Sequence, residues 1–179
     1  MIRDEEISRL KKYAQALGLV VRTINNPKED SASISLDGTE LTINEYHNKT
    51  KIETVLSLIH ELGHMLFFIH EKNRSHDIKF EEAIDRQNLH DTNISKTPPP
   101  KNLREKILNV EKQSADWWDV IYKETNCEFP YWKLELARKF DIWQYEVYYE
   151  TGKFPIKKER SLKYKELKKK MKKVNDRGV

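Results

Sequence analysis

His60, Glu61 and His64 stand together in the segment His60-Glu61-Leu62-Gly63-His64, and their types and spacing could do hydrolytic chemistry. Side chains four residues apart lie on one face of an α-helix, so both imidazoles can reach one ion while Glu61 lies beside it. Imidazole is a good ligand for Zn²⁺, and a catalytic zinc keeps three protein ligands and a water. The metal lowers the pKa of that water, and a neighbouring carboxylate can pass its proton to a leaving amine. The spacing predicts His60 and His64 as zinc ligands and Glu61 as general base and acid.

A third zinc ligand is less directly indicated, and Glu111 is the residue that we expect to supply it. Glu111 lies on the apolar face of a second predicted helix, where a carboxylate is costly to bury unless it meets a cation. Glu81 and Glu82 are alternatives in a polar segment, where a solvated role is usual. His70 is a further alternative at the spacing HExxHxxGxxH, although Phe67 replaces the glycine that would turn the chain.

Gly63 and Asp116 are the other residues near these candidates that need a reason. Glycine inside a helix costs about 1 kcal/mol relative to alanine, so Gly63 indicates a packing or functional constraint, such as space for a partner or substrate. Asp116 could accept a hydrogen bond from a ligand histidine and fix its tautomer, or it could be a polar surface residue.

Hydrophobic periodicity and turn residues predict the elements that must position these groups. A strand is predicted over 19–24, and a hairpin over 33–36 and 40–43 is predicted across Asp37-Gly38. Helices are predicted over 3–17, 49–71, 79–89, 101–125, 131–140 and 142–151, with a loop ending in three prolines before residue 101.

These elements predict an α+β fold in which a small antiparallel sheet from residues 19–44 packs near the HELGH helix, with a helical C-terminal half. We expect the strand near 32–44 to offer a free edge to an extended substrate. Residues 1–155 are expected to form one domain, and 156–179 a basic helical tail.

The segment HELGH, the preceding hairpin ISLDGTELTIN and the following helix VEKQSADWWDVIY resemble the ImmA/IrrE family of cytosolic zinc metallopeptidases over about residues 19–150. The resemblance implies a zincin-like, minimal gluzincin core with a glutamate ligand on a second helix. It also implies cleavage of a repressor or regulator in phage, mobile-element or stress circuits. The family's second motif is Glu-x-x-Ala-Asp or Glu-x-x-Ala-Asn. Here Ala115-Asp116 is present, but Lys112 stands three residues before Ala115, and Glu111 is one place early.

Composition places the chain among globular proteins of a reducing compartment. Of 179 residues, 35% are charged and 10% aromatic, which excludes wholesale disorder, and the one cysteine excludes a disulfide scaffold. No apolar run approaches the roughly 20 residues that span a bilayer, and the start has no signal-peptide core. We therefore expect a cytoplasmic protein without a membrane segment.

Charge is divided unevenly along the chain. Residues 157–173 hold ten Lys/Arg and two Glu, a balance of +8 that leaves about −4 for the rest of a chain whose net charge is +4. Such a tail can attract nucleic acid, or it can be a solvated interaction arm. Three function classes follow: a zinc endopeptidase acting on a protein partner, a non-catalytic zincin-like regulatory module, and a DNA-associated protease using the tail.

Overall fold

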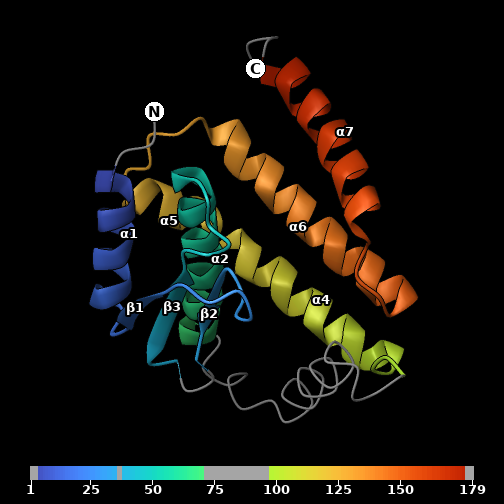
Figure 1. The fold of residues 1–179 in the computed structure, drawn as a ribbon, viewed down its shortest axis with the longest axis horizontal. Helices are drawn as coiled ribbons and strands as arrows, with labels where there is room; N and C mark the ends of the chain where they lie inside the picture. The colour runs from blue at the N-terminus through green and yellow to red at the C-terminus, as the bar shows by residue number, and fades with distance from the viewer. Residues whose placement is uncertain (1–3, 36–37, 71–96, 176–179) are drawn as a thin grey trace. The chain divides into compact units, whose positions relative to one another are not determined.

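The computed structural model describes residues 4–35, 38–70 and 97–175. In chain order the elements are α1 (Asp4–Ala16), β1 (Val20–Ile24), β2 (Ala32–Ile34), β3 (Glu40–Asn44), α2 (Lys51–His70), α4 (Lys101–Asp116), α5 (Trp118–Glu124), α6 (Tyr131–Thr151) and α7 (Lys157–Asn175) (Figure 1). The α+β class with a helical C-terminal half is thus confirmed. The predicted helix over 79–89 and most of the loop over 91–100 lie outside the described residues.

The described chain divides into two compact units. The first comprises Met1–His70 with Ser114–Pro130, and the second comprises Glu71–Gln113 with Tyr131–Val179. Helix α4 belongs to the second unit up to Gln113 and to the first from Ser114 onward. The predicted boundary at residue 155 remains a prediction.

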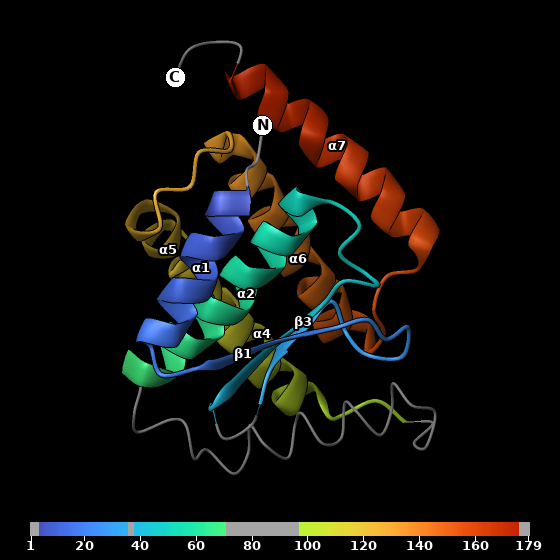
Figure 2. The same ribbon diagram turned by 60° about the vertical axis from the view of Figure 1, so that its left-hand side comes forward.

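The sheet of the first unit is mixed, in the order β1-β3-β2, and not antiparallel as predicted. The β2–β3 hairpin is antiparallel as expected, whereas β1 runs parallel to β3, side by side with it in Figure 2. After β1 the chain passes to the opposite edge of the sheet and forms β2. It then turns back and forms β3 between β1 and β2. The predicted edge strand near 32–44 is therefore β2 alone.

The side chain of Asn44 holds this crossover in place. Its amide is fully buried, donates to the carbonyls of Asn26 (2.6 Å) and Glu29 (3.0 Å), and accepts from the Asn26 amide (3.1 Å). Buried amides of this kind must find partners inside the protein, and Asn44 finds them in the connection between β1 and β2. A loop without regular structure is thereby fixed relative to the central strand.

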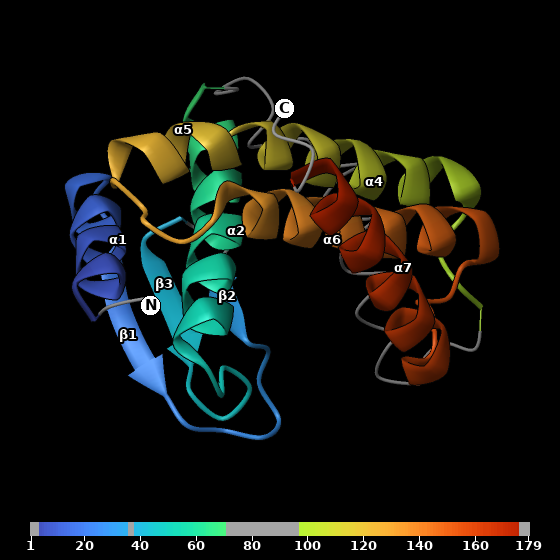
Figure 3. The same ribbon diagram turned by 90° about the horizontal axis from the view of Figure 1, so that it is seen from above.

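One face of the sheet is covered by α1 and α2, which run side by side in Figures 1 and 3. Leu41 and Ile43 of the central strand are almost fully buried toward these helices, and Arg22 pairs with Glu40 (2.8 Å) on the opposite, polar face. This alternation is typical of a strand with one solvated face. The HELGH helix α2 contacts β2 and β3, as predicted.

By length and composition, α2 is the described helix that could cross a membrane. It is 20 residues long, and the sequence expectation of no such run was therefore too strict. Its buried residues pack against α1, α5 and the sheet, as in the core helix of a globular unit.

The boundaries of the C-terminal helices differ from the predictions in two places. The predicted helix over 101–125 is broken at Trp117, whose amide donates to the Ser114 carbonyl in a tight turn (3.1 Å). The two helices predicted over 131–140 and 142–151 are one helix, α6, because Asp141 alone, without glycine or proline, does not end a helix whose aromatic periodicity continues.

In the second unit, Gly152 follows the last residue of α6 with a positive φ of 71°, so the helix ends at residue 151 as predicted. Arg104 donates to the last carbonyls of that helix, those of Tyr148 (3.0 Å) and Tyr149 (2.5 Å). Phe154 then stacks on the buried Tyr148 ring at 4.6 Å. These contacts fix the chain direction before α7 begins.

Candidate metal centre

The two histidines of the HELGH segment meet on one face of α2, as their spacing predicted. Their Nε2 atoms lie 3.2 Å apart, and their rings meet edge to face with centroids 4.8 Å apart. The nearer carboxylate oxygen of Glu61 lies 3.9 Å from His60 Nε2. The Glu61 and His60 side chains are 15% and 22% exposed, so the group is sheltered without being sealed from water.

The separation of the two ring nitrogens fits a shared metal ion. Two nitrogens bound at 2.0–2.1 Å to a tetrahedral zinc stand about 3.3–3.4 Å apart, close to the observed 3.2 Å. Without an ion, the same separation suits a hydrogen bond from one ring N–H to the other ring nitrogen. In both descriptions the two Nε2 atoms face each other on the same side of α2.

Ser114, from the last turn of α4, contacts the other nitrogen of His64. Its Oγ lies 2.9 Å from His64 Nδ1, and the Ser114 side chain is buried. For His64 to bind a metal through Nε2, Nδ1 must carry the proton and donate it to Ser114 Oγ. Ser114 thus occupies the position beside a histidine ring nitrogen that the sequence suggested for Asp116, whereas Asp116 is exposed on another side of the helix.

Glu111 is the third residue of the group. One ligand atom each from His60, His64 and Glu111 can be chosen so that all lie within 4.8 Å of one another. A metal ion can be held by three or more His, Cys, Asp or Glu side chains that lie close together. Among residues 4–35, 38–70 and 97–175, His60, His64 and Glu111 form such a group. Glu111 lies on α4 three residues before Ser114, and residues three apart share a helix face.

Lys112 stands where the expected Glu-x-x-Ala-Asp pattern would place a glutamate, and its side chain points in a different direction from that of Glu111. Lys112 is rotated by about 100° along α4 relative to Glu111 and pairs with Glu146 of α6 at 3.0 Å. Ser114 and Ala115, three and four residues after Glu111, are both buried. The carboxylate at position 111 is thus in register with the buried end of α4.

The alternative ligands have different positions. His70 lies at the end of α2, where its ring stacks on Trp117 with centroids 4.4 Å apart, and it is not part of the three-residue group. Because α2 continues through Phe67 without a turn, the chain does not bring His70 back toward His64. Glu81 and Glu82 lie outside the described residues.

Gly63 is explained by a close approach of chain segments within the first unit. A Cβ atom at this position would lie 2.7 Å from the Ser114 carbonyl oxygen and 2.9 Å from Cδ1 of Trp118. The missing side chain thus makes room for the end of α4 and the start of α5, and not for a substrate as the sequence suggested.

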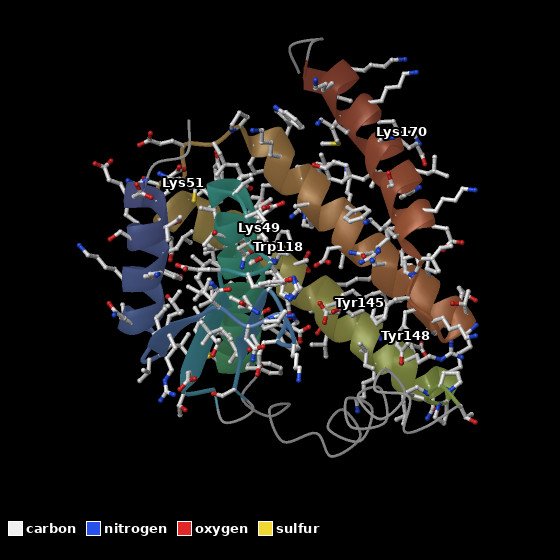
Figure 4. The ribbon with its side chains drawn as sticks, in the orientation of Figure 1. Lys49, Lys51, Trp118, Tyr145, Tyr148 and Lys170 are labelled. Atoms are coloured by element: carbon white, nitrogen blue, oxygen red, sulfur yellow. The ribbon has the colours of Figure 1, made fainter. Side chains whose placement is uncertain are left out.

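Trp118 also forms one wall of the group. Its ring lies edge to face with His60 at 5.7 Å, and Figure 4 shows it beside α2. The residue is 3% exposed and belongs to the core of the first unit, as is usual for an aromatic residue on the apolar face of a helix. Its contact with a predicted ligand was missed, as was that of Ser114. The signal for Ser114 was a polar residue on an otherwise apolar helix face.

No family model, curated protein or solved structure matches the chain. Its function is therefore inferred from the geometry of its own residues.

Proposed function

We propose that this protein is a zinc-dependent endopeptidase with a zincin-like fold that cleaves a cytosolic protein partner, such as a transcriptional repressor or another regulator. The observation that carries the proposal is the pair of Nε2 atoms 3.2 Å apart, with Glu61 beside them and Glu111 in the same group. Two imidazoles and one carboxylate are a common ligand set of catalytic zinc, which leaves one position open.

His60, His64 and Glu111 would hold the ion, and Ser114 would fix the ring of His64. The bound zinc would supply a Lewis acid that polarises the peptide carbonyl and acidifies the attacking water. Shelter from bulk water strengthens such electrostatic effects, and the low exposure of the His60 and Glu61 side chains agrees with this role.

Glu61 would move the proton. Its carboxylate takes one proton from the water as the oxygen attacks the carbonyl carbon, and then gives it to the nitrogen as the C–N bond breaks. Glu61 is next to His60 in the chain yet is not in the ligand group, so it is left for this task.

The β2 strand would align the substrate. It lies at an edge of the sheet and against α2, and edge strands can pair with an extended peptide through main-chain hydrogen bonds. An extended peptide added to β2 would run along the helix that carries the histidines.

The substitution Glu61→Gln tests the mechanism. We expect the variant to keep one zinc per chain and to lose cleavage by at least 100-fold, because the amide cannot accept the proton but no ligand is removed. Zinc is measured by mass spectrometry of the purified protein. Cleavage is measured by labelling new protein N-termini in cells that express either form.

The variant Glu111→Gln is the second arm, and Glu105→Gln is its matched control on an exposed position of the same helix. Zinc should be lost in the first and retained in the second. Zinc binding without any fragment that depends on Glu61 would contradict the peptidase and would instead identify a zincin-like binding module. Zinc retained in Glu111→Gln but lost in His70→Ala, Glu81→Ala or Glu82→Ala would show that another residue is the third ligand.

A further inference from the structure

Helix α7 uses its apolar face within its own unit. Tyr164 meets the ring of Phe140 edge to face at 5.4 Å, the Lys163 ammonium lies 5.9 Å from the Trp143 ring centroid, and Met171 Sδ lies 3.8 Å from the Lys139 ammonium. All three contacts are made with α6. This side of α7 is therefore occupied.

The side of α7 that faces away from α6 carries a lysine stripe. We define the stripe by four exposed lysines: Lys158, Lys165, Lys169 and Lys172. Three of them are seven residues apart and Lys169 follows Lys165 by four residues, so all four lie on one face of the helix. The first and the last lysine are 14 residues apart, which is about 21 Å along the helix axis. Figure 4 shows nitrogen-tipped side chains along this side of the helix, where Lys170 is labelled nearby.

The acidic residues of α7 do not neutralise the lysine stripe. Glu166 pairs with Lys170 (2.5 Å) and Lys163 (3.2 Å), and these hydrogen bonds lower its pKa. Glu159 accepts a hydrogen bond from the amide of Ile156 at the start of the helix (2.8 Å). Within residues 4–35, 38–70 and 97–175, the four lysines of the stripe form no ion pair. Like charges on one helix face repel one another, which a polyanion would relieve.

We propose that the lysine stripe binds the phosphate backbone of duplex DNA without sequence preference. Lysine ammonium groups are point charges that bind phosphate, and the duplex carries one charge per about 1.7 Å of its axis. The stripe contains no Asn or Gln to read adenine and no Asp or Glu to read cytosine, and its lysines follow one another along the helix as phosphate contacts do, so we expect binding that does not depend on sequence.

Two other partners fit the helix less well. Single strands are bound by stacking of successive bases on exposed aromatic rings. Helix α7 has one aromatic residue, Tyr164, which is 40% exposed but meets Phe140 of α6 edge to face, on the side of the helix away from the stripe. A membrane-surface helix inserts its apolar face into lipid, but that face of α7 packs on α6. On the stripe side, Leu162 is the exposed apolar residue of the described helix.

The test compares the full chain with the variant Lys158→Gln, Lys165→Gln, Lys169→Gln, Lys172→Gln. Binding to a labelled 30-base-pair duplex of random sequence is measured by fluorescence anisotropy from 50 to 200 mM KCl. With four phosphate contacts, the wild-type affinity should fall on the order of 100-fold over this range. The stripe variant should bind at least tenfold more weakly at 50 mM and lose most of the salt dependence.

The matched control is the variant Lys12→Gln, Lys28→Gln, Lys123→Gln, Lys153→Gln, which removes the same charge from exposed positions outside α7. It should bind within about twofold of the wild type. An equal loss in both variants, tighter binding to the single strand of the same length, or binding to vesicles with phosphatidylserine but not to the duplex would overturn the proposal. Zinc content is unaffected by either variant, so this outcome is separate from that of the peptidase.

Discussion

Ser114 links the end of α4 to the candidate metal centre through one hydrogen bond to His64 Nδ1. A ligand histidine that donates its second ring N–H to a fixed acceptor keeps its tautomer and orientation, and loss of such a partner weakens metal binding 10- to 100-fold. Serine is a weaker acceptor than the carboxylate often found in this role, so we place its effect at the lower end of that range.

The substitution Ser114→Ala should therefore weaken zinc binding about tenfold without changing the fold. Affinity is measured by competition with a chromophoric chelator, and the His64 tautomer is followed by ¹⁵N chemical shifts of its ring. The control Ser8→Ala removes an exposed hydroxyl from α1 and should change neither. Ser114→Thr, which restores the hydroxyl, should recover the affinity. An unchanged chelator titration for Ser114→Ala would show that the bond does not orient His64.

At these positions the sequence was informative wherever chemistry depends on spacing along one helix. His60 and His64 meet because α-helical geometry fixes the i, i+4 relation, whatever surrounds them. Ser114 could not be identified in the same way, because its contact joins residues 50 apart in the chain. The carboxylate of Asp116 would be a stronger hydrogen-bond acceptor for a histidine ring than the hydroxyl of Ser114, but Asp116 lies on an exposed side of the helix.

Gly63 shows how two elements depend on one missing side chain. The Ser114 carbonyl and the Trp118 ring occupy the space of a Cβ atom, so α2 and the α4–α5 junction approach more closely than ordinary side chains permit. A backbone carbonyl cannot rotate away as a flexible side chain can.

We expect Gly63→Ala to lower the free energy of unfolding by about 1–3 kcal/mol through this clash. Alanine has a higher helix propensity than glycine, which returns about 1 kcal/mol. The net decrease in the free energy of unfolding should therefore be up to about 2 kcal/mol. Urea unfolding followed by tryptophan fluorescence measures the change. Thr54→Ala, also in α2, raises helix propensity without this contact and should change stability much less. A Gly63→Ala protein more stable than the wild type would contradict the close approach.

Elements defined by local periodicity were predicted within a few residues, and α2 is the best example. Features that depend on distant partners were not. The parallel pairing of β1 with β3 comes from the crossover that Asn44 holds, and a hydrophobic pattern is the same for parallel and antiparallel neighbours. Likewise, the break between α4 and α5 at Trp117 could not be predicted, because no glycine or proline stands there.

Cys127 is the single thiol of the 179-residue chain, so its reactivity reports on the folded protein as a whole. It is 8% exposed, and burial raises its pKa, while the nearby hydroxyl of Thr125 partly opposes this effect. The thiolate is the reactive form, so both burial and the raised pKa protect the residue.

We expect labelling of Cys127 by a disulfide reagent at pH 8 to be at least 100-fold slower than in urea, and to accelerate in parallel with unfolding. Because the neutral thiol is favoured in the folded state, the unfolded chain loses its proton first, at a pKa of about 8.5. The contribution of Cys127 to stability is therefore complete below that pH and decreases as the pH rises above it. Rapid labelling of one thiol per chain in native buffer would contradict this burial.

The contact between Gly63 and the Ser114 carbonyl also limits how this lineage can diverge. A mutation that adds a side chain at position 63 costs less stability after a change that moves the α4–α5 junction away from α2, so the two sites should drift together and not independently. Distant descendants would then be recognised by a paired signature, glycine between the histidines and tryptophan at the start of the downstream helix, even where the rest of the sequence has been replaced.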